Sequence, residues 1–268
     1  MFSLLSRKGK AGDTRPPRGG LGRTYAIGDV HGRFDLFVGM LRLIEDDLAK
    51  RPIDIFKIIF LGDLIDRGPQ SADIIELAEA LSRSTSHLQF LKGNHEELFL
   101  RAFAGDAQAA SFFYSVGGRE TLMSYGLDCA EGDAMSGEQL VAWMKLHITD
   151  SHIRFISRFD DMIQSGDFIF VHAGIKPHVP LHRQTISDLR WIRNEFLNCE
   201  TLHPGVIVHG HSITQEVEER PNRIGIDTGA YFSGRLTAIA IEGDDRWYLT
   251  ATDDAAVTTA SAETVETP

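Results

Sequence analysis

The chain is short of cysteine and of long apolar runs. Its 268 residues include only two cysteines, Cys129 and Cys199. Two cysteines are too few for a disulfide framework in a chain of this length and are typical of a reducing compartment, although the two could still pair. No apolar run approaches the roughly 20 residues that span a bilayer, and the first residues reverse the order of a secretory signal. We therefore expect a cytoplasmic protein with no membrane span.

The chain is also poor in positive charge. It has 27 Lys and Arg against 38 Asp and Glu, which gives a formal net charge of -11 at pH 7. Because clustered Lys and Arg supply most of the affinity for a nucleic-acid backbone, this balance excludes a general nucleic-acid binder and leaves room only for a local basic pocket. The content of hydrophobic residues, 43%, is high enough for a substantial core, which we expect to form one domain.

Composition separates a central folded region from two tails. Residues 1–22 are rich in Gly, Pro, Arg and Lys, and residues 251–268 offer little to bury, so we expect both tails to be disordered. A single folded domain is then expected over residues 23–250. Within it, residues 97–165 mix helical patterns with glycines and predict a helical insertion over the sheet.

The first third of the folded region alternates β-rich runs with helical periodicity. The pattern predicts the order β-α-β-α-β over residues 24–27, 34–50, 55–61, 72–83 and 87–91. Apolar residues recur at helical spacing in both helices, so one face of each is expected to pack on the core. The last third predicts strands at 168–171, 206–208, 223–226, 236–241 and 246–249.

Polar residues follow directly after five of the predicted strands, within residues 28–32, 62–68, 93–96, 172–174 and 209–211. The carboxyl ends of neighbouring strands in an open α/β sheet meet in one crevice, so we expect these groups to lie close together. Asp29 and His31 stand two residues apart, which in extended backbone would point both side chains to one side.

These strand ends supply a set of metal donors, namely Asp29, His31, Asp63, Asn94, His172 and His211. Mixed oxygen and nitrogen donors without thiolates suit manganese, iron or zinc better than magnesium. The set exceeds the needs of one ion, so we predict two divalent cations about 3.5–4 Å apart that share a carboxylate.

Asp63, on the central strand of the first three, is the expected bridge. We assign Asp29, His31 and Asp63 to one metal, and the second metal to Asp63, Asn94, His172 and His211. His209 stands two residues from His211, and it either joins the site or supports it from behind.

Three motifs resemble those of the phosphoprotein phosphatase family of metallophosphoesterases: Gly-Asp-x-His-Gly at 28–32, Gly-Asp-x-x-Asp-Arg-Gly at 62–68 and Gly-Asn-His-Glu at 93–96. The resemblance covers residues 25–242, and the Trp-Ile-Arg stretch at 191–193 is most similar to the bacterial and phage lambda branch. It implies an α/β fold, a β-sandwich flanked by helices, with the β-α-β-α-β unit carrying the metal motifs and a helical insertion.

The resemblance also implies roles for individual residues. His95 would be the general acid, paired with Asp66. Arg67 and Arg193 would hold the phosphate oxygens, with Asn94 touching the phosphate as well as a metal. Another arginine, three residues before Arg193, leaves open which of the two is the second phosphate clamp.

The implied activity is hydrolysis of phosphorylated serine or threonine side chains, with dual specificity as an extension, by in-line attack of a hydroxide that bridges two metal ions. A phosphoprotein is then the expected partner. The main alternative is a symmetrical dinucleoside tetraphosphate hydrolase, which typically lacks the second aspartate of the middle motif and has Gly-Asn-His-Asp. Asp66 and Glu96 therefore favour the phosphatase. A non-catalytic phosphoprotein-binding scaffold is a further alternative, which the complete ligand set disfavours.

Overall fold

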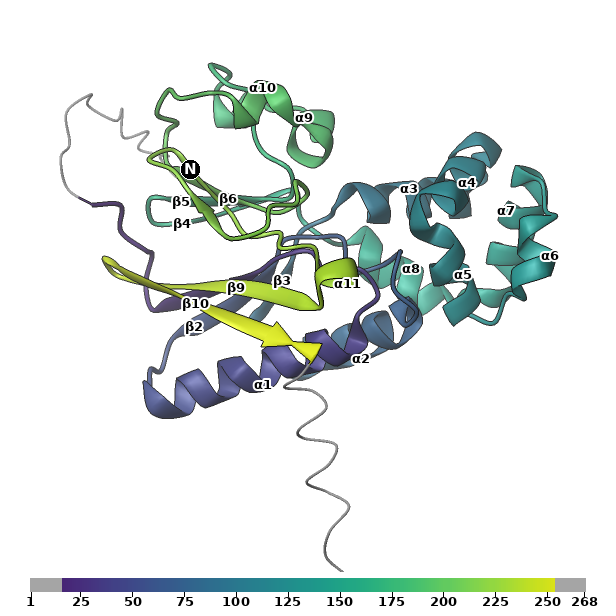
Figure 1. Ribbon diagram of the computed structural model, residues 1–268, viewed down its shortest axis with the longest axis horizontal. Coiled ribbons are helices and arrows are strands. Elements are labelled where there is room, and N and C mark those ends of the chain that lie inside the picture. The colour runs from purple at the N-terminus through teal and green to yellow at the C-terminus, as the bar shows by residue number, and fades with distance from the viewer. Residues whose placement is uncertain (1–15, 254–268) are drawn as a thin grey trace, which may run out of the picture.

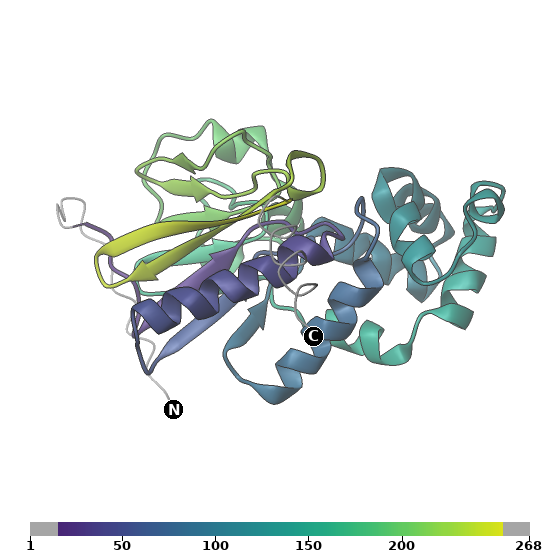
Figure 2. The same ribbon diagram turned by 60° about the horizontal axis from the view of Figure 1, so that its bottom comes forward.

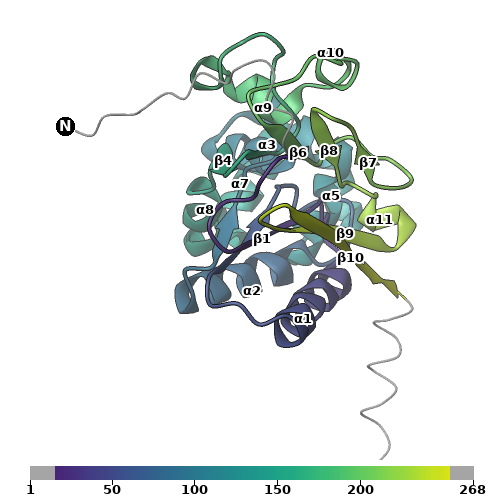
Figure 3. The same cartoon turned by 90° about the vertical axis from the view of Figure 1, so that its left-hand side faces the viewer.

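The structure, a computed structural model, describes residues 16–253. Two mixed five-stranded sheets pack face to face, and helices cover their outer faces (Figures 1 and 3). The first sheet has the order β10-β9-β1-β2-β3, and the second has the order β4-β5-β6-β8-β7. This α/β sandwich flanked by helices confirms the predicted fold class.

The strands of the first sheet are β1 (Arg23–Ile27), β2 (Phe56–Phe60), β3 (Leu88–Phe90), β9 (Arg235–Glu242) and β10 (Asp245–Thr252). β1, β2 and β3 run parallel, and β9 and β10 complete the sheet antiparallel. The strands of the second sheet are β4 (Met162–Ser165), β5 (Phe168–Val171), β6 (Val206–His209), β7 (Glu218–Glu219) and β8 (Arg223–Gly225). In that sheet β5, β6 and β8 are parallel.

Alternation along the strands divides the apolar side chains between two cores. In β1, Ala26 faces the interior of the sandwich, whereas Tyr25 and Ile27 face α1 (Phe34–Lys50) and α2 (Ser71–Ser84). A strand that is buried on both faces can anchor the residues that follow it, because neither face is free to move. The outer face of the second sheet packs on α9 (Ile186–Trp191) and α10 (Asn194–Leu197).

The predicted insertion exists as a group of helices: α3 (Asn94–Ala104), α4 (Ala107–Phe113), η1 (Tyr114–Gly118), α5 (Arg119–Ser124), α6 (Cys129–Asp133), α7 (Gly137–His147) and α8 (Asp150–Ser157). It projects from the end of the sandwich where β1, β2 and β3 finish, so the expectation that it lies over the sheet is wrong (Figures 1 and 2). Residues 162–165 were predicted to be part of the insertion but form β4 instead. Their hydrogen bonds with β5 stabilise this strand, and the segment is too short for its local pattern to predict one.

Part of the segment predicted to be a disordered N-terminal tail is bonded to the folded domain. The Gly19 amide donates to the carbonyl of Gly243, and the Arg18 carbonyl accepts from the Asp167 amide. Gly22 has φ 75°, and a Cβ there would lie 2.1 Å from the Ile55 carbonyl oxygen. A glycine is therefore needed at this position because the two backbone segments approach closely, and it does not indicate disorder. Residues 251 and 252 belong to β10. The rest of the two predicted tails lies outside the described residues.

Two smaller expectations concern the cysteines and the membrane. Cys129 and Cys199 are both free thiols. Among residues 16–253, no helix has the length and apolar character needed to cross a bilayer.

Candidate active site

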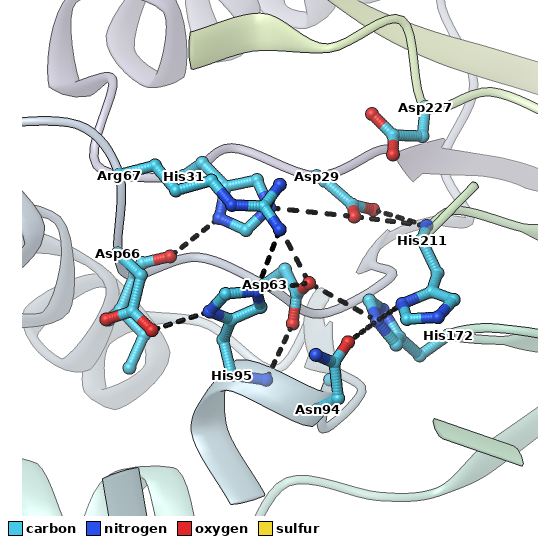
Figure 4. A network of polar contacts seen from close by, with 12 residues as sticks. Asp29, His31, Asp63, Asp66, Arg67, Asn94, His95, His172, His211 and Asp227 are labelled. Atoms are coloured by element: carbon cyan, nitrogen blue, oxygen red, sulfur yellow. Dashed lines mark hydrogen bonds and ion pairs between the residues drawn. The ribbon is translucent and has the colours of Figure 1, made fainter. Parts of the chain in front are cut away.

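The residues that follow β1, β2, β3, β5 and β6 come together at one place. Figure 4 shows their side chains turned toward one another. All six predicted metal donors lie there and are buried, namely Asp29, His31, Asp63, Asn94, His172 and His211. α3 begins at Asn94, so that residue is presented by a helix start directly after its strand. The structure therefore brings together groups that are up to 182 residues apart in the chain, as the contact of the His211 amide with the Asp29 carboxylate shows.

The backbone at these strand ends is not extended. His31, Asp63 and His211 all have positive φ, at 47°, 50° and 62°. The side chains of Asp29 and His31 still converge, with Oδ2 of Asp29 4.0 Å from Nε2 of His31. The prediction that extended backbone brings them together is wrong. A left-handed turn costs roughly 1–2 kcal/mol for a residue with a Cβ, and such strain gathers at functional sites.

Glu96 holds two of these loops together. Its carboxylate accepts hydrogen bonds from the amides of Asp63, Leu64 and Gly93 at 2.8–2.9 Å. Glu96 stands at the third position of α3, from which an acidic side chain can reach back to the residue before the helix. It therefore sets the position of the Asp63 carboxylate relative to the start of α3.

Two histidines present acceptor atoms to the site. Nδ1 of His31 donates to the Ile65 carbonyl and Nδ1 of His172 donates to the Leu61 carbonyl, both at 2.8 Å. In each ring this leaves the Nε2 lone pair facing oxygen: Oδ2 of Asp63 lies 3.6 Å from Nε2 of His31 and 3.4 Å from that of His172. Acceptors that face one another need a proton or a cation between them.

The carboxylates of the site are crowded as well. Burial, followed by repulsion from Asp227, raises the pKa of Asp29 well above its usual value. Burial alone would lower the pKa of His172, but the charge of Asp63 outweighs it and raises that pKa to about 10. Oδ2 of Asp227 and Nε2 of His211 find no hydrogen-bond partner among the described residues. Buried negative charge and unpartnered acceptors are what a divalent cation compensates, so the residues present fit a metal centre.

Two groups of ligand atoms lie within 4.8 Å of one another: His31, Asp63 and His95, and Asp63, His172 and His211. Asp63 belongs to both groups, as expected of a bridge. His95 stands in the first group where we assigned Asp29. Asp29 stays the predicted ligand, because its buried carboxylate lies 4.0 Å from Nε2 of His31, whereas Nδ1 of His95 is bound to Asp66, which suits His95 to a different role.

His95 pairs with Asp66. Its Nδ1 lies 2.6 Å from Oδ2 of Asp66, and its Nε2 lies 3.1 Å from the Arg67 guanidinium (Figure 4). Burial would lower the pKa of His95, but the charges of Asp63 and Asp66 outweigh it and raise that pKa. An imidazole that two carboxylates make more basic than usual is suited to be a general acid.

Arg67 lies across the site. Its guanidinium reaches Nε2 of His31 at 3.0 Å and lies 4.8 Å from the centre of the Tyr231 ring. Arg67 and Asp66 are consecutive residues with positive φ, 67° and 74°. This loop directs the guanidinium toward the predicted ligands, where phosphate oxygens would lie.

The two arginines that the sequence left as alternatives differ in environment. Arg190 is buried and bonded to Asp161 and Glu97, so its guanidinium is already used. Arg193 is exposed, and its guanidinium lies 3.5 Å from the His211 carbonyl. The geometry therefore favours Arg193 as the second phosphate clamp, which stays a prediction.

His209 faces away from the predicted ligands. Its ring lies 5.1 Å from that of Phe196, under α10, and Nδ1 contacts the Gly210 carbonyl. Burial lowers the pKa of His209 to about 4. It therefore packs behind the site and is not one of the groups that face the acceptor cluster.

Sequence reasoning left three residues of this region out of the site. Asp227 follows β8, so the pattern of polar residues after strands could have identified it. Tyr231 lies in α11 (Ala230–Ser233), and Thr121 lies in the insertion, where its hydroxyl contacts the Asp66 carboxylate at 2.6 Å. Nothing in the local pattern around Tyr231 or Thr121 indicates that they approach the motifs.

Comparison with known proteins identifies similar chains. Residues 22–230 match the calcineurin-like phosphoesterase family. An asymmetrical bis(5'-nucleosyl)-tetraphosphatase of Anoxybacillus flavithermus is 24% identical and aligns with 80% of this chain and 88% of its own length. A symmetrical bis(5'-nucleosyl)-tetraphosphatase of Methylobacillus flagellatus is also 24% identical, over 82% of this chain and 92% of its own length.

Two solved structures share the fold. One is described as a candidate diadenosine tetraphosphatase and has a TM-score of 0.60 at 19% identity, over 87% of this chain and 95% of that one. The other is a cold-active protein tyrosine phosphatase with a TM-score of 0.51 at 17% identity, over 86% of this chain and 79% of that one. At these identities the likeness extends to the fold alone.

Proposed function

We propose that this chain, which belongs to the calcineurin-like phosphoesterase family, hydrolyses the phosphate anhydride of bis(5'-nucleosyl) tetraphosphates. The observation that carries the proposal is the alignment with bis(5'-nucleosyl)-tetraphosphatases over 80% or more of this chain. It reverses the order expected from the sequence, in which a phosphoprotein substrate came first. Glu96 was one reason for that order, but its carboxylate holds the amides of Asp63 and Leu64, so it carries little information about the substrate.

The residues of the site suit phosphoryl transfer to water. The family's divalent ions, when bound, supply a water of lowered pKa and positive charge beside the phosphoryl oxygens. Asp29, His31, Asp63, Asn94, His172 and His211 would hold them. Arg67 and Arg193 can bind phosphate oxygens through paired N–H groups and orient the phosphorus for attack. As the new bond from water oxygen to phosphorus forms, the bond from phosphorus to the leaving oxygen breaks, and Nε2 of His95 delivers a proton to that oxygen.

A pair of aromatic side chains, one of which contacts Arg67, supports a nucleotide substrate. The Tyr231 ring contacts the Arg67 guanidinium, and the ring of Phe232, 63% exposed, lies 5.2 Å from that of Tyr231. An exposed aromatic ring next to a phosphate site can stack on a base, which is worth roughly 1–3 kcal/mol per base.

A phosphomonoester of a protein side chain is the second candidate, and the pair of His95 and Asp66 favours it. Protonation matters most when the leaving group is an alkoxide, which is far more basic than a departing nucleotide phosphate. A buried carboxylate 2.6 Å from Nδ1 of His95 is therefore more useful to a phosphomonoesterase than to an anhydride hydrolase.

The test compares specificity constants on one preparation loaded with Mn²⁺. Diadenosine tetraphosphate, a phosphoserine peptide and nitrophenyl phosphate serve as substrates, with Asp63→Asn as the inactive control. We expect the dinucleotide to be the best of the three by at least about 10-fold, since each stacked base adds its own binding energy. Phe232→Ala should raise KM for the dinucleotide and leave nitrophenyl phosphate unchanged. A preference for the phosphopeptide would instead assign the second candidate.

A further inference from the structure

One segment of the insertion, residues 117–121, contacts the loop that carries Asp66 and Arg67. The Arg67 amide donates to the Gly117 carbonyl at 2.9 Å, and the Asp66 amide donates to the Thr121 hydroxyl at 2.9 Å. Gly117 has φ 123°, and a Cβ there would lie 2.7 Å from Cγ of Arg67, so the contact is close. The insertion therefore supplies a hydrogen-bond acceptor to the backbone amide of Asp66 and to that of Arg67.

The hydroxyl of Thr121 also fixes the Asp66 carboxylate. It donates to Oδ1 of Asp66 at 2.6 Å, while Oδ2 of the same carboxylate lies 2.6 Å from Nδ1 of His95. Thr121 and Asp66 are fully buried, and the Ser71 hydroxyl lies 2.9 Å from that of Thr121. With one oxygen bound on each side, the carboxylate cannot rotate about its last bond without breaking a buried hydrogen bond.

We propose that Thr121 is a positioning residue: its hydroxyl orients the Asp66 carboxylate and through it aims the His95 imidazole at the leaving oxygen. The inference rests on the proposed function in one respect, the role of His95 as proton donor. It gives the insertion a part in the chemistry, because Thr121 is the side chain by which α5 reaches the Asp66–His95 pair. Thr121 itself contacts neither phosphate nor predicted metal ligand.

A neighbouring residue separates this role from simple anchoring of the insertion. Ser124 lies one turn further along α5, where its hydroxyl accepts from the Ala72 amide and donates to the Thr121 carbonyl. It ties α5 to α2 through hydrogen bonds that do not include Asp66. Ser124→Ala therefore loosens the same helix contact and leaves the carboxylate bound.

The experiment uses the full chain loaded with metal and a series of phosphomonoesters of rising leaving-group pKa, from nitrophenyl phosphate through phenyl phosphate to a phosphoserine peptide. Thr121→Val keeps the volume and removes the hydroxyl, and Thr121→Ser restores it. We expect Thr121→Val to lose about 10- to 100-fold on the peptide, as a lost second contact of this kind commonly does, and less than about 3-fold on nitrophenyl phosphate. Thr121→Ser and Ser124→Ala should keep the wild-type dependence on leaving group.

Two further measurements keep the result unambiguous. Metal content, determined on the same samples, should be unchanged in Thr121→Val. In the Asp66→Asn background, Thr121→Val should cause almost no further loss of activity, because both changes remove the same orienting effect on His95. Thr121→Ala carries the same test if the valine variant does not fold.

Three results would overturn the inference: an equal loss on every ester, a failure of Thr121→Ser to recover activity, or additivity with Asp66→Asn. A wild type that hydrolyses the esters but not the dinucleotide would overturn the proposed function and leave the test of Thr121 intact, and the two failures are therefore distinct.

Discussion

The two halves of the site use histidine in different ways. In the ligand half, Nδ1 of His31 and of His172 donates to a backbone carbonyl, and Nε2 faces the Asp63 carboxylate. In the acid half, Nδ1 of His95 is bound to the Asp66 carboxylate, and Nε2 faces Arg67. The partner of Nδ1 distinguishes them: a backbone carbonyl holds the ring with Nε2 turned toward the Asp63 carboxylate, whereas the Asp66 carboxylate favours retention of the proton that His95 would give up.

The largest expected effect tests the ligand half. Asp63→Asn should reduce turnover by more than about 10⁴-fold, because a neutral amide bridges two cations poorly and the ions supply several kcal/mol of transition-state stabilisation. Metal analysis of the purified variant should find less than the two equivalents expected of the wild type. A folded Asp63→Asn protein with near-normal activity would remove Asp63 from the bridge.

The next prediction would break the distinction between the two halves if it failed. His95→Asn should keep both metals and lose about 10²- to 10⁴-fold on a phosphoserine peptide, with a smaller loss on nitrophenyl phosphate, whose leaving group needs little protonation. His172→Asn should instead lose metal and activity on every substrate alike. If His95→Asn loses metal, then His95 belongs to the ligand half.

Much of this arrangement could be predicted because it follows from strand ends. The motifs at Asp29, Asp63 and Asn94 each follow a buried parallel strand, and the crossover helices place those strands side by side. Once that sheet is predicted, the convergence of its carboxyl ends follows from geometry. The boundaries of α1 could be predicted from a local pattern, because its apolar residues recur at helical spacing along its whole length.

What could not be predicted depends on contacts between distant segments. The left-handed backbone of His31 and Asp66 is stabilised by hydrogen bonds to other loops, which no local pattern encodes. The approach of Thr121 to Asp66 requires the insertion to fold back on the motif loop. Arg190 and Arg193 look equivalent in sequence, and only the ion pairs of Arg190 with partners 29 and 93 residues away separate them.

The arginines give a prediction of intermediate size. Arg193→Ala should lower kcat/KM by about 10- to 100-fold, the cost of one charge-assisted phosphate contact, with no change in thermal stability. Arg190→Ala should keep kcat/KM within about 3-fold but destabilise the fold by about 1–2 kcal/mol, since Asp161 and Glu97 are partly exposed and lose only part of their compensation. Steady-state kinetics and denaturant unfolding on both variants check this, and an active Arg193→Ala with an inactive Arg190→Ala would exchange their roles.

His209 sharpens the comparison, because it shows that a carbonyl partner alone does not make a ligand. Its Nδ1 contacts the Gly210 carbonyl, as His31 and His172 contact carbonyls, but its ring packs on Phe196 and burial lowers its pKa to about 4. The folded-state pKa lies below the unfolded value near 6.5, so the unfolded chain binds the proton first. The stabilisation from the neutral ring is therefore complete above pH 6.5 and is lost as pH falls toward 4. At about 1.4 kcal/mol per pKa unit it amounts to at most about 3 kcal/mol.

Unfolding by urea between pH 7 and pH 4, in the presence of a chelator so that metal binding does not contribute, should give a shallower pH dependence for His209→Asn than for the wild type. Parallel curves for the two proteins would mean that folding does not lower the pKa of His209. The buried ring would then need a carboxylate partner. Among the described histidines of the site, only His95 has such a partner on its Nδ1.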